Sequence, residues 1–324
     1  MKKTRIIALL LCVVMLLTTL TGCGKKTVMT INGEKIPEGI YTYFYSYYYV
    51  SAMSAGQDMA AEDLASAAIG QIAQQVAIKD LIKQLKIELT PMENKEIIDT
   101  REAAIEEMTR AVYASMLKAM NMTEKQYEEM DKTNYLYNKL AQYYYGEGGA
   151  EAPTDEDLIA DFSSKYIRAS HILLSTQEAE SDADRAAIKA KAEEVLAKAK
   201  AGEDFADLIR EYGEDPGLAE YPEIGYYFTT GQMVAEFETA AFELEENAIS
   251  ELVETSYGYH IIKRLPLDEA YASAAALTED YYNAYCSNLL MQKLMAHADS
   301  FEIELSEEIS KVDITNAMMF WMGY

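Results

Sequence analysis

Apolar positions divide the chain into three regions with different periodicities. From 38 to 145 they recur at three- and four-residue intervals, which predicts a succession of helices. The region 166–266 begins and ends in short runs rich in β-branched and aromatic residues, which predict strands. Helical spacing returns from 267 to about 298. The pattern therefore predicts a mixed domain between two mainly helical parts.

The middle region has the pattern of a single α+β domain. Strands are expected at 167–174 and at 255–263, and each carries one histidine, His171 or His260. Helical spacing between them covers 188–199, 205–212 and a third short patch ending near Phe242, and an irregular stretch containing glycine and proline occupies 214–225. The order β-α-α-loop-α-β predicts helices that cover an antiparallel sheet.

The helical parts carry their own turn and cap signals. Asn32-Gly33 predicts a hairpin over 28–36, and Thr123 with Gln126 forms a capping box. Helices are expected over 39–53, 61–85, 92–120, 123–145 and 267–298, a short helix starting near Thr154, a linker at 146–150, and a strand over 301–305 followed by an apolar tail. Seven aromatic residues lie between Tyr41 and Tyr49. They suit either a helix surface or a contact area for another polypeptide.

The first residues have the features of a targeting segment. Three basic residues precede a 12-residue apolar run, which suits the core of a signal peptide and is short for a membrane span. Leu20-Thr21-Gly22-Cys23 follows and resembles the lipobox of bacterial lipoproteins. The sequence thus predicts a signal peptide over 1–22 and a lipid anchor on Cys23.

Charge and cysteine content exclude several classes of function. The net charge is −26, and removal of 1–22 would leave 25 basic and 54 acidic side chains, a net charge of −29. Such a chain repels nucleic acid and anionic lipid. Cys286 would be the only free thiol, so no intramolecular disulfide is expected. His171 and His260 have no carboxylate or thiol at ligand spacing, so no metal site is expected.

Four motifs in the middle region stand in a characteristic order and spacing. They are Ala169-Ser170-His171-Ile172-Leu173, Gly202-Glu203-Asp204-Phe205-Ala206, Gly231-Gln232-Met233 with Phe237 four residues on, and Gly258-Tyr259-His260-Ile261-Ile262. Together they resemble the parvulin-type peptidyl-prolyl cis–trans isomerases over about 100 residues. One segment departs from the resemblance, because 221–225 is Tyr-Pro-Glu-Ile-Gly where the family usually has Gly-Gly-Asp-Leu-Gly.

The resemblance implies a site without cofactor or metal. Its catalytic residues would be His171, Asp215, Thr255 and His260, and its substrate-binding residues Ile224, Tyr227, Gln232, Met233 and Phe237. The two histidines would hydrogen-bond to each other across the site floor, with Thr255 orienting one ring. Met233, Phe237 and Ile224 would line the proline pocket, Tyr227 would form an aromatic wall, and Asp215 would act electrostatically on the substrate amide.

The layout of the whole chain resembles the PrsA-type extracytoplasmic foldase lipoproteins. The resemblance implies a signal peptide at 1–22, a chaperone-like part at 23–160, the isomerase at 166–266, and a helical part at 267–324 that packs on the N-terminal part. It implies an anchored protein outside the cytoplasm that acts on unfolded, proline-containing secreted polypeptides, alone or as a homodimer.

Two other functions stay open. One is a holding chaperone with a weak or inactive isomerase module, which an isomerisation assay would separate from an active foldase. The other is a solute-binding lipoprotein, which would need two lobes with repeated βαβ patterns, whereas the flanks here are helical.

Overall fold

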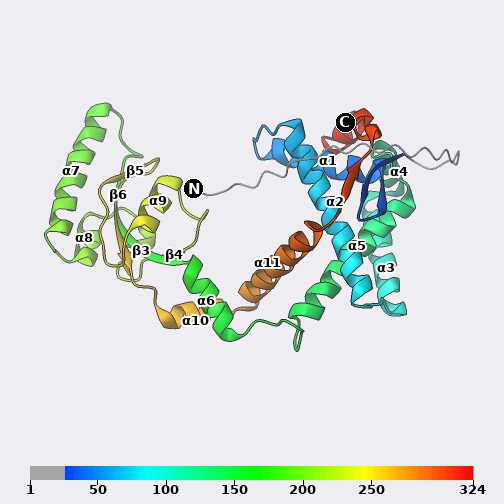
Figure 1. Ribbon diagram of the computed structural model, residues 1–324. Coiled ribbons are helices and arrows are strands. Elements are labelled where there is room, and N and C mark those ends of the chain that lie inside the picture. Colours follow the sequence, from blue (N-terminus) through cyan, green and yellow to red (C-terminus); the bar gives the residue numbers. More distant parts are fainter. Residues whose placement is uncertain (1–25, 324) are drawn as a thin grey trace. The chain divides into compact units, whose positions relative to one another are not determined.

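The structure is a computed structural model that describes residues 26–323 (Figure 1). The predicted signal peptide and the lipidation residue Cys23 lie outside these residues. The described chain forms two compact units, one made of 26–140 with 293–323 and the other of 141–292. We describe each unit by itself.

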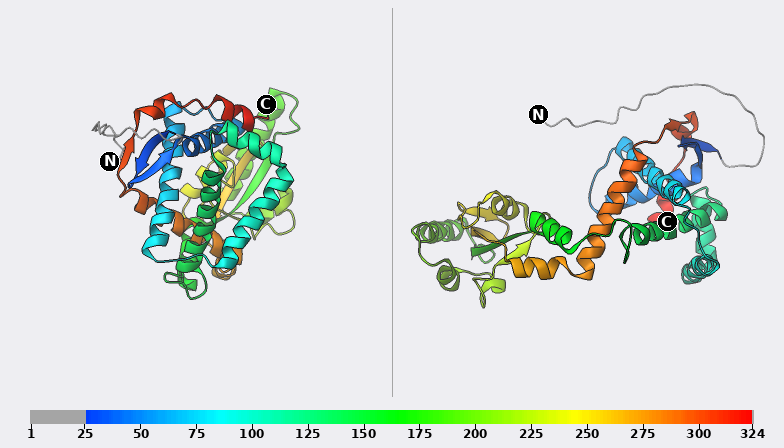
Figure 2. Two further views of the ribbon diagram at one scale, coloured as in Figure 1. Left: turned by 90° about the vertical axis from the view of Figure 1, so that its right-hand side faces the viewer. Right: turned by 60° about the horizontal axis from the view of Figure 1, so that its bottom comes forward.

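A three-stranded sheet joins the beginning and the end of the chain within the first unit. Its order is β2 (Glu34–Pro37), β1 (Thr27–Ile31) and β7 (Ile303–Leu305), and all pairs are antiparallel. Figure 2 shows orange-red β7 beside the blue hairpin. Asn32 and Gly33 have φ values of 48° and 78°, as a tight two-residue turn requires. The predicted hairpin is therefore confirmed.

The helices of the first unit follow the predicted order with one additional break. They are α1 (Glu38–Ser54), α2 (Ala61–Gln84), α3 (Pro91–Met108), α4 (Arg110–Ala119), most of α5 (Glu124–Tyr145) and α12 (Thr315–Trp321), with a 3₁₀ turn at Glu307–Lys311. The single helix expected over 92–120 is divided at Thr109, whose φ is 74°. Thr109 then caps α4, because its side chain accepts a hydrogen bond from the backbone N–H of Val112.

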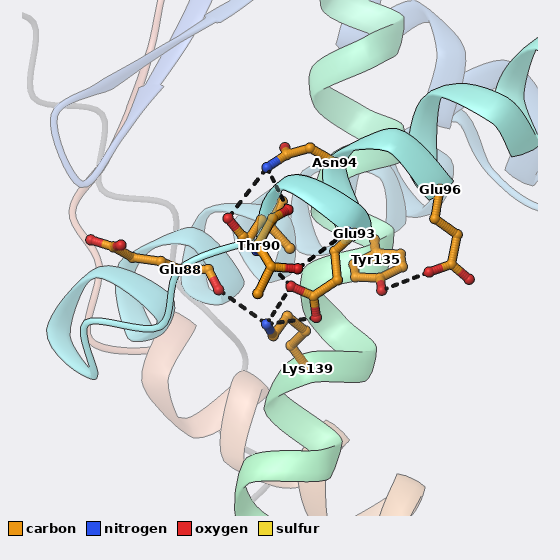
Figure 3. A network of polar contacts seen from close by, with 8 residues as sticks. Glu88, Thr90, Glu93, Asn94, Glu96, Tyr135 and Lys139 are labelled. Atoms are coloured by element: carbon orange, nitrogen blue, oxygen red, sulfur yellow. Dashed lines mark hydrogen bonds and ion pairs between the residues drawn. The ribbon is translucent and has the colours of Figure 1, made fainter.

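A polar network fixes the start of α3 against α5 (Figure 3). Thr90 and Glu93 form a capping box, in which each side chain accepts a hydrogen bond from the other residue's backbone N–H. The ammonium group of Lys139 donates to Glu93 at 2.8 Å and to the Glu88 carbonyl at 3.0 Å. These bonds lower the pKa of Glu93 to about 2, so its carboxylate stays charged at neutral pH.

The apolar tail forms the helix α12 and packs on α1. Trp321 donates a 3.1 Å hydrogen bond from Nε1 to Ser46 Oγ, and its ring lies 5.9 Å from that of Tyr43. Ala317 is fully buried. The C-terminal segment thus contributes both a strand and a helix to the first unit.

The second unit is built on a four-stranded antiparallel sheet in the order β4-β3-β6-β5. The strands are β3 (Ile167–Ser175), β4 (Tyr226–Phe228), β5 (Val253–Thr255) and β6 (Gly258–Leu265). The helices are α6 (Asp155–Lys165), α7 (Asp182–Lys200), α8 (Phe205–Tyr212), α9 (Ala235–Glu243), α10 (Glu269–Ala276) and the first part of α11 (Glu279–Ala298), with a 3₁₀ turn at Pro216–Leu218. The predicted α+β class is confirmed.

Alternation along the central strands gives the sheet two different faces. Ile172 on β3 and Ile261 on β6 pack against the apolar sides of α7 and α8. The opposite face carries Ala169 and Ile262, which pack with Phe237 of α9. His171 and His260 alternate with the residues under α7 and α8, so both histidines lie on the α9 face.

The helix expected over 267–298 is interrupted at Leu277-Thr278, between α10 and α11. Ala272 and Ala276 of α10 are buried against Leu158 and Phe162 of α6. Residues 267–292 therefore lie in the second unit and 293–323 in the first, whereas all of 267–324 was expected to pack on the N-terminal part. No helix within 26–323 is both long and apolar enough to span a membrane.

Candidate active site

Strand register places the two histidines side by side. His171 pairs with Ile262 and Leu173 pairs with His260, so the histidines are diagonal neighbours on one face of β3 and β6. Their ring centroids are 5.1 Å apart with the planes tilted by 57°. Both side chains are buried, with 6% and 5% exposure. The histidines thus form the floor of the site.

The expected hydrogen bond between the histidines is not formed, and each ring faces another partner. His171 Nε2 lies 3.1 Å from Asp215 Oδ2, and His260 Nε2 lies 2.8 Å from Thr255 Oγ1. Within the described chain, Nδ1 of both rings has no hydrogen-bond partner, and Nε2 of His171 approaches Asp215 as an ion-pair contact without the alignment of a hydrogen bond. Thr255 does lie beside one ring, as expected.

Asp215 reaches the floor because its loop is attached to the second half of β3, which extends beyond the short strand β4. The backbone N–H of Glu214 donates to the Leu173 carbonyl at 2.9 Å, and its carboxylate accepts from the Ser175 N–H at 2.7 Å. Asp215 then caps the short 3₁₀ turn, accepting from the Gly217 N–H at 2.9 Å. The carboxylate consequently points at His171.

The electrostatics of the floor set the protonation of three groups. The close contact with His171, together with the hydrogen bonds from Gly217 and Tyr226, lowers the pKa of Asp215 to about 2. Burial, together with the neighbouring His171, lowers the pKa of His260 to about 4. Burial and the hydrogen bond to Asp215 raise the pKa of Tyr226 to about 12. At neutral pH Asp215 is therefore an anion, His260 is neutral and Tyr226 keeps its proton.

An apolar wall stands against the histidine floor. Phe237 on α9 is 4% exposed, and its ring meets the rings of His171 and His260 edge-on at 5.1 and 5.4 Å. Phe228 lies 5.9 Å from the Phe237 ring, and the partly buried Met233 packs in the same cluster. Met233 and Phe237 are therefore brought together as expected.

Tyr227, which was expected to form a wall of the site, lies on the other face of the sheet. Tyr227 pairs with Arg168 across β3 and β4, and its ring stacks on Tyr271 at 3.6 Å. The Arg168 guanidinium lies 5.4 Å from the same ring. Side chains alternate between the two faces along a strand, so Tyr227 points away from the face that carries His171. Tyr226 and Phe228 are the residues of β4 that share a face with His171.

Ile224 and Gln232 also depart from their expected positions. The Ile224 side chain is 47% exposed and is not among the residues packed around Phe237, while its carbonyl accepts from Arg168 Nε at 2.7 Å. Gln232 is exposed, and its Oε1 accepts from the Thr229 N–H at 2.9 Å. The altered 221–225 segment is thus held by its backbone, and Gln232 closes a turn.

The sequence did not identify Tyr226 and Phe228 as site residues. Tyr226 donates a 3.0 Å hydrogen bond to Asp215 Oδ2, and Phe228 is 1% exposed beneath Phe237. Their spacing of two residues could have indicated this role, because residues two apart in a strand lie on the same face. Among residues 26–323, no group of three or more histidine, cysteine or acidic side chains could hold a metal ion.

Comparisons with known proteins identify two regions of the chain. Residues 159–265 match the PPIC-type PPIase domain, and residues 1–141 match the SurA-like N-terminal domain. A foldase protein PrsA of a Geobacillus species is 29% identical over 74% of this chain and 81% of its own length. PrsA proteins of Geobacillus kaustophilus and Bacillus subtilis are 33% and 35% identical, and the matches cover only 60% and 44% of their lengths.

Solved structures include relatives of the same name. The crystal structure of PrsA from Bacillus cereus is 21% identical and covers 92% of this chain and 97% of its own, with a TM-score of 0.39. The solution structure of the Nitrosopumilus maritimus parvulin is 38% identical over 32% of this chain and 97% of its own, with a TM-score of 0.25. The chain therefore carries a parvulin-type peptidyl-prolyl cis–trans isomerase domain and a SurA-like N-terminal domain, and it is similar to proteins named PrsA foldase.

Proposed function

We propose that this chain is an anchored foldase outside the cytoplasm, and that its isomerase acts on X-Pro bonds of secreted polypeptides. The observation that carries the proposal is the pairing of an ionised Asp215 with a buried histidine floor, directly beside the apolar wall of Phe237. A proline ring is apolar and its amide is polar, so the site offers one surface for each.

The reaction needs no bond to be made or broken. Resonance gives the X-Pro C–N bond partial double-bond character and a rotation barrier of roughly 18–20 kcal/mol. Rotation removes this resonance and changes the charge on the amide nitrogen and oxygen. A site with fixed charges therefore lowers the barrier if it stabilises the twisted amide more than the planar one.

Each residue of the site has a role in this scheme. Met233 and Phe237 hold the proline ring, so that rotation occurs in the chain before it. Asp215 supplies a fixed negative charge next to the rotating amide. His171 and His260 hold this arrangement from below, and Thr255 orients the His260 ring. No step requires a cofactor.

The role of the whole chain rests on its two flanks and its first residues. The name of the relatives, foldase, and the SurA-like match support a chain that handles unfolded polypeptides. The lipobox ending in Cys23 supports attachment to the outer face of a membrane through lipid. The strongly negative charge supports a protein client and argues against nucleic acid. Monomer and homodimer are both compatible with this role.

Refolding of a protein whose slow phase is prolyl isomerisation separates a foldase from a holding chaperone. The wild-type chain should accelerate the slow phase, and Asp215→Asn should slow that acceleration roughly 10-fold while leaving the fold intact. A holding chaperone would instead suppress aggregation without changing the slow phase. That result would contradict the proposed function.

The anchor has its own test. Wild-type protein produced in a bacterium with lipoprotein processing should partition into a detergent phase, and Cys23→Ala should stay in the aqueous phase. Equal partitioning of the two proteins would contradict anchoring without bearing on the isomerase.

A further inference from the structure

The Tyr226 hydroxyl joins two parts of the site. It donates a 3.0 Å hydrogen bond to Asp215 Oδ2. Its ring lies at 26° to the His171 ring, with centroids 6.0 Å apart. Tyr226 pairs with Ala169, two residues before His171, so backbone hydrogen bonds fix its position relative to the floor. One side chain on a paired strand therefore touches both Asp215 and His171.

Asp215 needs such a restraint because it stands in a loop. Its Oδ1 accepts from the Gly217 N–H, and its Oδ2 faces Tyr226 and His171. Since the two oxygens have different partners, the carboxylate cannot rotate without losing bonds on both sides. Gly217 belongs to the same loop and moves with Asp215. Tyr226 and His171 are the partners that belong to the sheet.

We propose that Tyr226 is a positioning residue of the isomerase, whose hydroxyl holds the Asp215 carboxylate at the place where it acts on the substrate amide. The inference rests on the role proposed above for Asp215. The role is distinct from that of Phe237, because Tyr226 acts through Asp215.

Two further features fit this role. Burial and Asp215 raise the pKa of Tyr226 to about 12, so the hydroxyl remains a donor throughout the neutral range. A Cβ on Gly217 would lie 1.9 Å from the Tyr226 hydroxyl oxygen, although the backbone of Gly217 is not left-handed. A side chain at this position would therefore collide with the Tyr226 hydroxyl and displace it, whereas the backbone conformation would accept a side chain.

The test is a double-mutant cycle on the full chain with an X-Pro peptide. Tyr226→Phe keeps the ring and removes the hydroxyl, so kcat should fall roughly 3- to 10-fold with KM nearly unchanged. In an Asp215→Asn background the same change should lower kcat less than about twofold, because its target is already lost.

Two more variants test the same role without relying on Tyr226→Phe alone. Gly217→Ala keeps Tyr226 but displaces its hydroxyl, so it should lower kcat in the same direction. Tyr212→Phe is the matched control, since that hydroxyl accepts a hydrogen bond from Lys198 on the α7 and α8 side of the module. This control should leave kcat unchanged.

Each outcome decides between the two claims. Full kcat in folded Tyr226→Phe, a changed KM in place of kcat, or equal losses in both backgrounds would overturn the positioning role while the role of Asp215 stands. Full kcat in Asp215→Asn would overturn the proposed role of Asp215, and the inference about Tyr226 with it.

Discussion

Phe237 contributes both to the packing of the core and to the wall of the site, so a mutation of Phe237 affects stability and activity together. Its ring is 4% exposed and packs with Phe228 and Ile262, yet it also forms the wall beside both histidines. Met233 is only partly buried in the same cluster. The two side chains therefore contribute differently to stability while both contribute to substrate binding.

We predict that Phe237→Ala lowers both stability and activity, whereas Met233→Ala lowers mainly activity. Loss of a buried phenylalanine costs about 3–5 kcal/mol of unfolding free energy, and the partly buried methionine should cost clearly less. Circular dichroism melts and kcat/KM measured on the same samples separate the two effects. A Met233→Ala variant with full kcat/KM would contradict its placement in the proline pocket.

The buried His260 couples the stability of the module to pH. Its pKa is held at about 4 against an ordinary value of 6.5, so between these values the unfolded chain binds a proton that the folded chain excludes. Stability should therefore be full above pH 6.5 and decrease as the pH falls towards 4, by up to about 3 kcal/mol.

Hydrogen exchange of the β3 and β6 amides measures this effect inside the full chain. His260→Gln should remove the pH-dependent loss. Trp321 lies in the other unit, so its fluorescence should not report the pH-dependent loss of stability in the module. The same pH slope in wild type and His260→Gln would show that another group causes it.

At the residue scale, the sequence predicted those side chains whose motif fixes their spacing. Met233 and Phe237 follow Gly231-Gln232 in the motif, and they lie in one cluster in which Phe237 contacts the histidines. Tyr226 was not predicted, because its role depends on which face of β4 it occupies. The preceding 221–225 segment has no periodicity from which that face could be read.

Among the elements, the loop after β3 carries an acidic cluster and starts beside the turn that holds Thr255. The Thr176 N–H donates to the Tyr257 carbonyl at 3.0 Å, so the loop starts beside the turn that carries Thr255. Three exposed acidic side chains follow, Glu178, Glu180 and Asp182. Arg185, which contacts Thr176 Oγ1, is outnumbered by them.

We predict that the isomerase disfavours phosphoserine before proline. The acidic loop repels a phosphate carrying about −2 charge, so kcat/KM should be at least about threefold lower than for the unmodified peptide. Peptides with Lys or Arg at this position should be accepted. Faster turnover of the phosphopeptide than of its unmodified counterpart would refute the prediction, and high salt should narrow the difference.

Helices and strands with long periodic patterns could be predicted from the sequence, whereas the positions at which one element ends and the next begins were harder to predict. The helix expected over 92–120 ends at Thr109, where a positive φ occurs without glycine or proline to announce it. Strand β4 has only three residues and exists because it pairs with the edge of β3. Both features depend on tertiary contacts, which local periodicity does not contain.

At the scale of the whole molecule, the isomerase module contains all strands of its own sheet, whereas the N-terminal and C-terminal parts share one sheet and are expected to depend on each other. All four strands of the second sheet lie within 167–265. In the first unit, β1 pairs with β7 and α12 packs on α1. The ends of the chain thus supply parts of one sheet and one helical layer.

We predict that residues 166–266 fold alone, and that 27–160 without 267–324 loses helical content or aggregates. Circular dichroism and light scattering of the two fragments test this, with the isolated module as the control for fragment handling. A soluble, fully helical 27–160 fragment would contradict the interdependence of the flanks.

The most direct test of the account is the rate at which the full chain interconverts cis and trans X-Pro in a short peptide, measured by exchange NMR without a coupling protease. We expect wild type to accelerate the interconversion, Asp215→Asn to lose about 90% of that acceleration while remaining folded, and Tyr212→Phe to match wild type. Acceleration that is unchanged in Asp215→Asn, or absent in the wild type, would contradict the claim that this site catalyses prolyl isomerisation through a fixed charge.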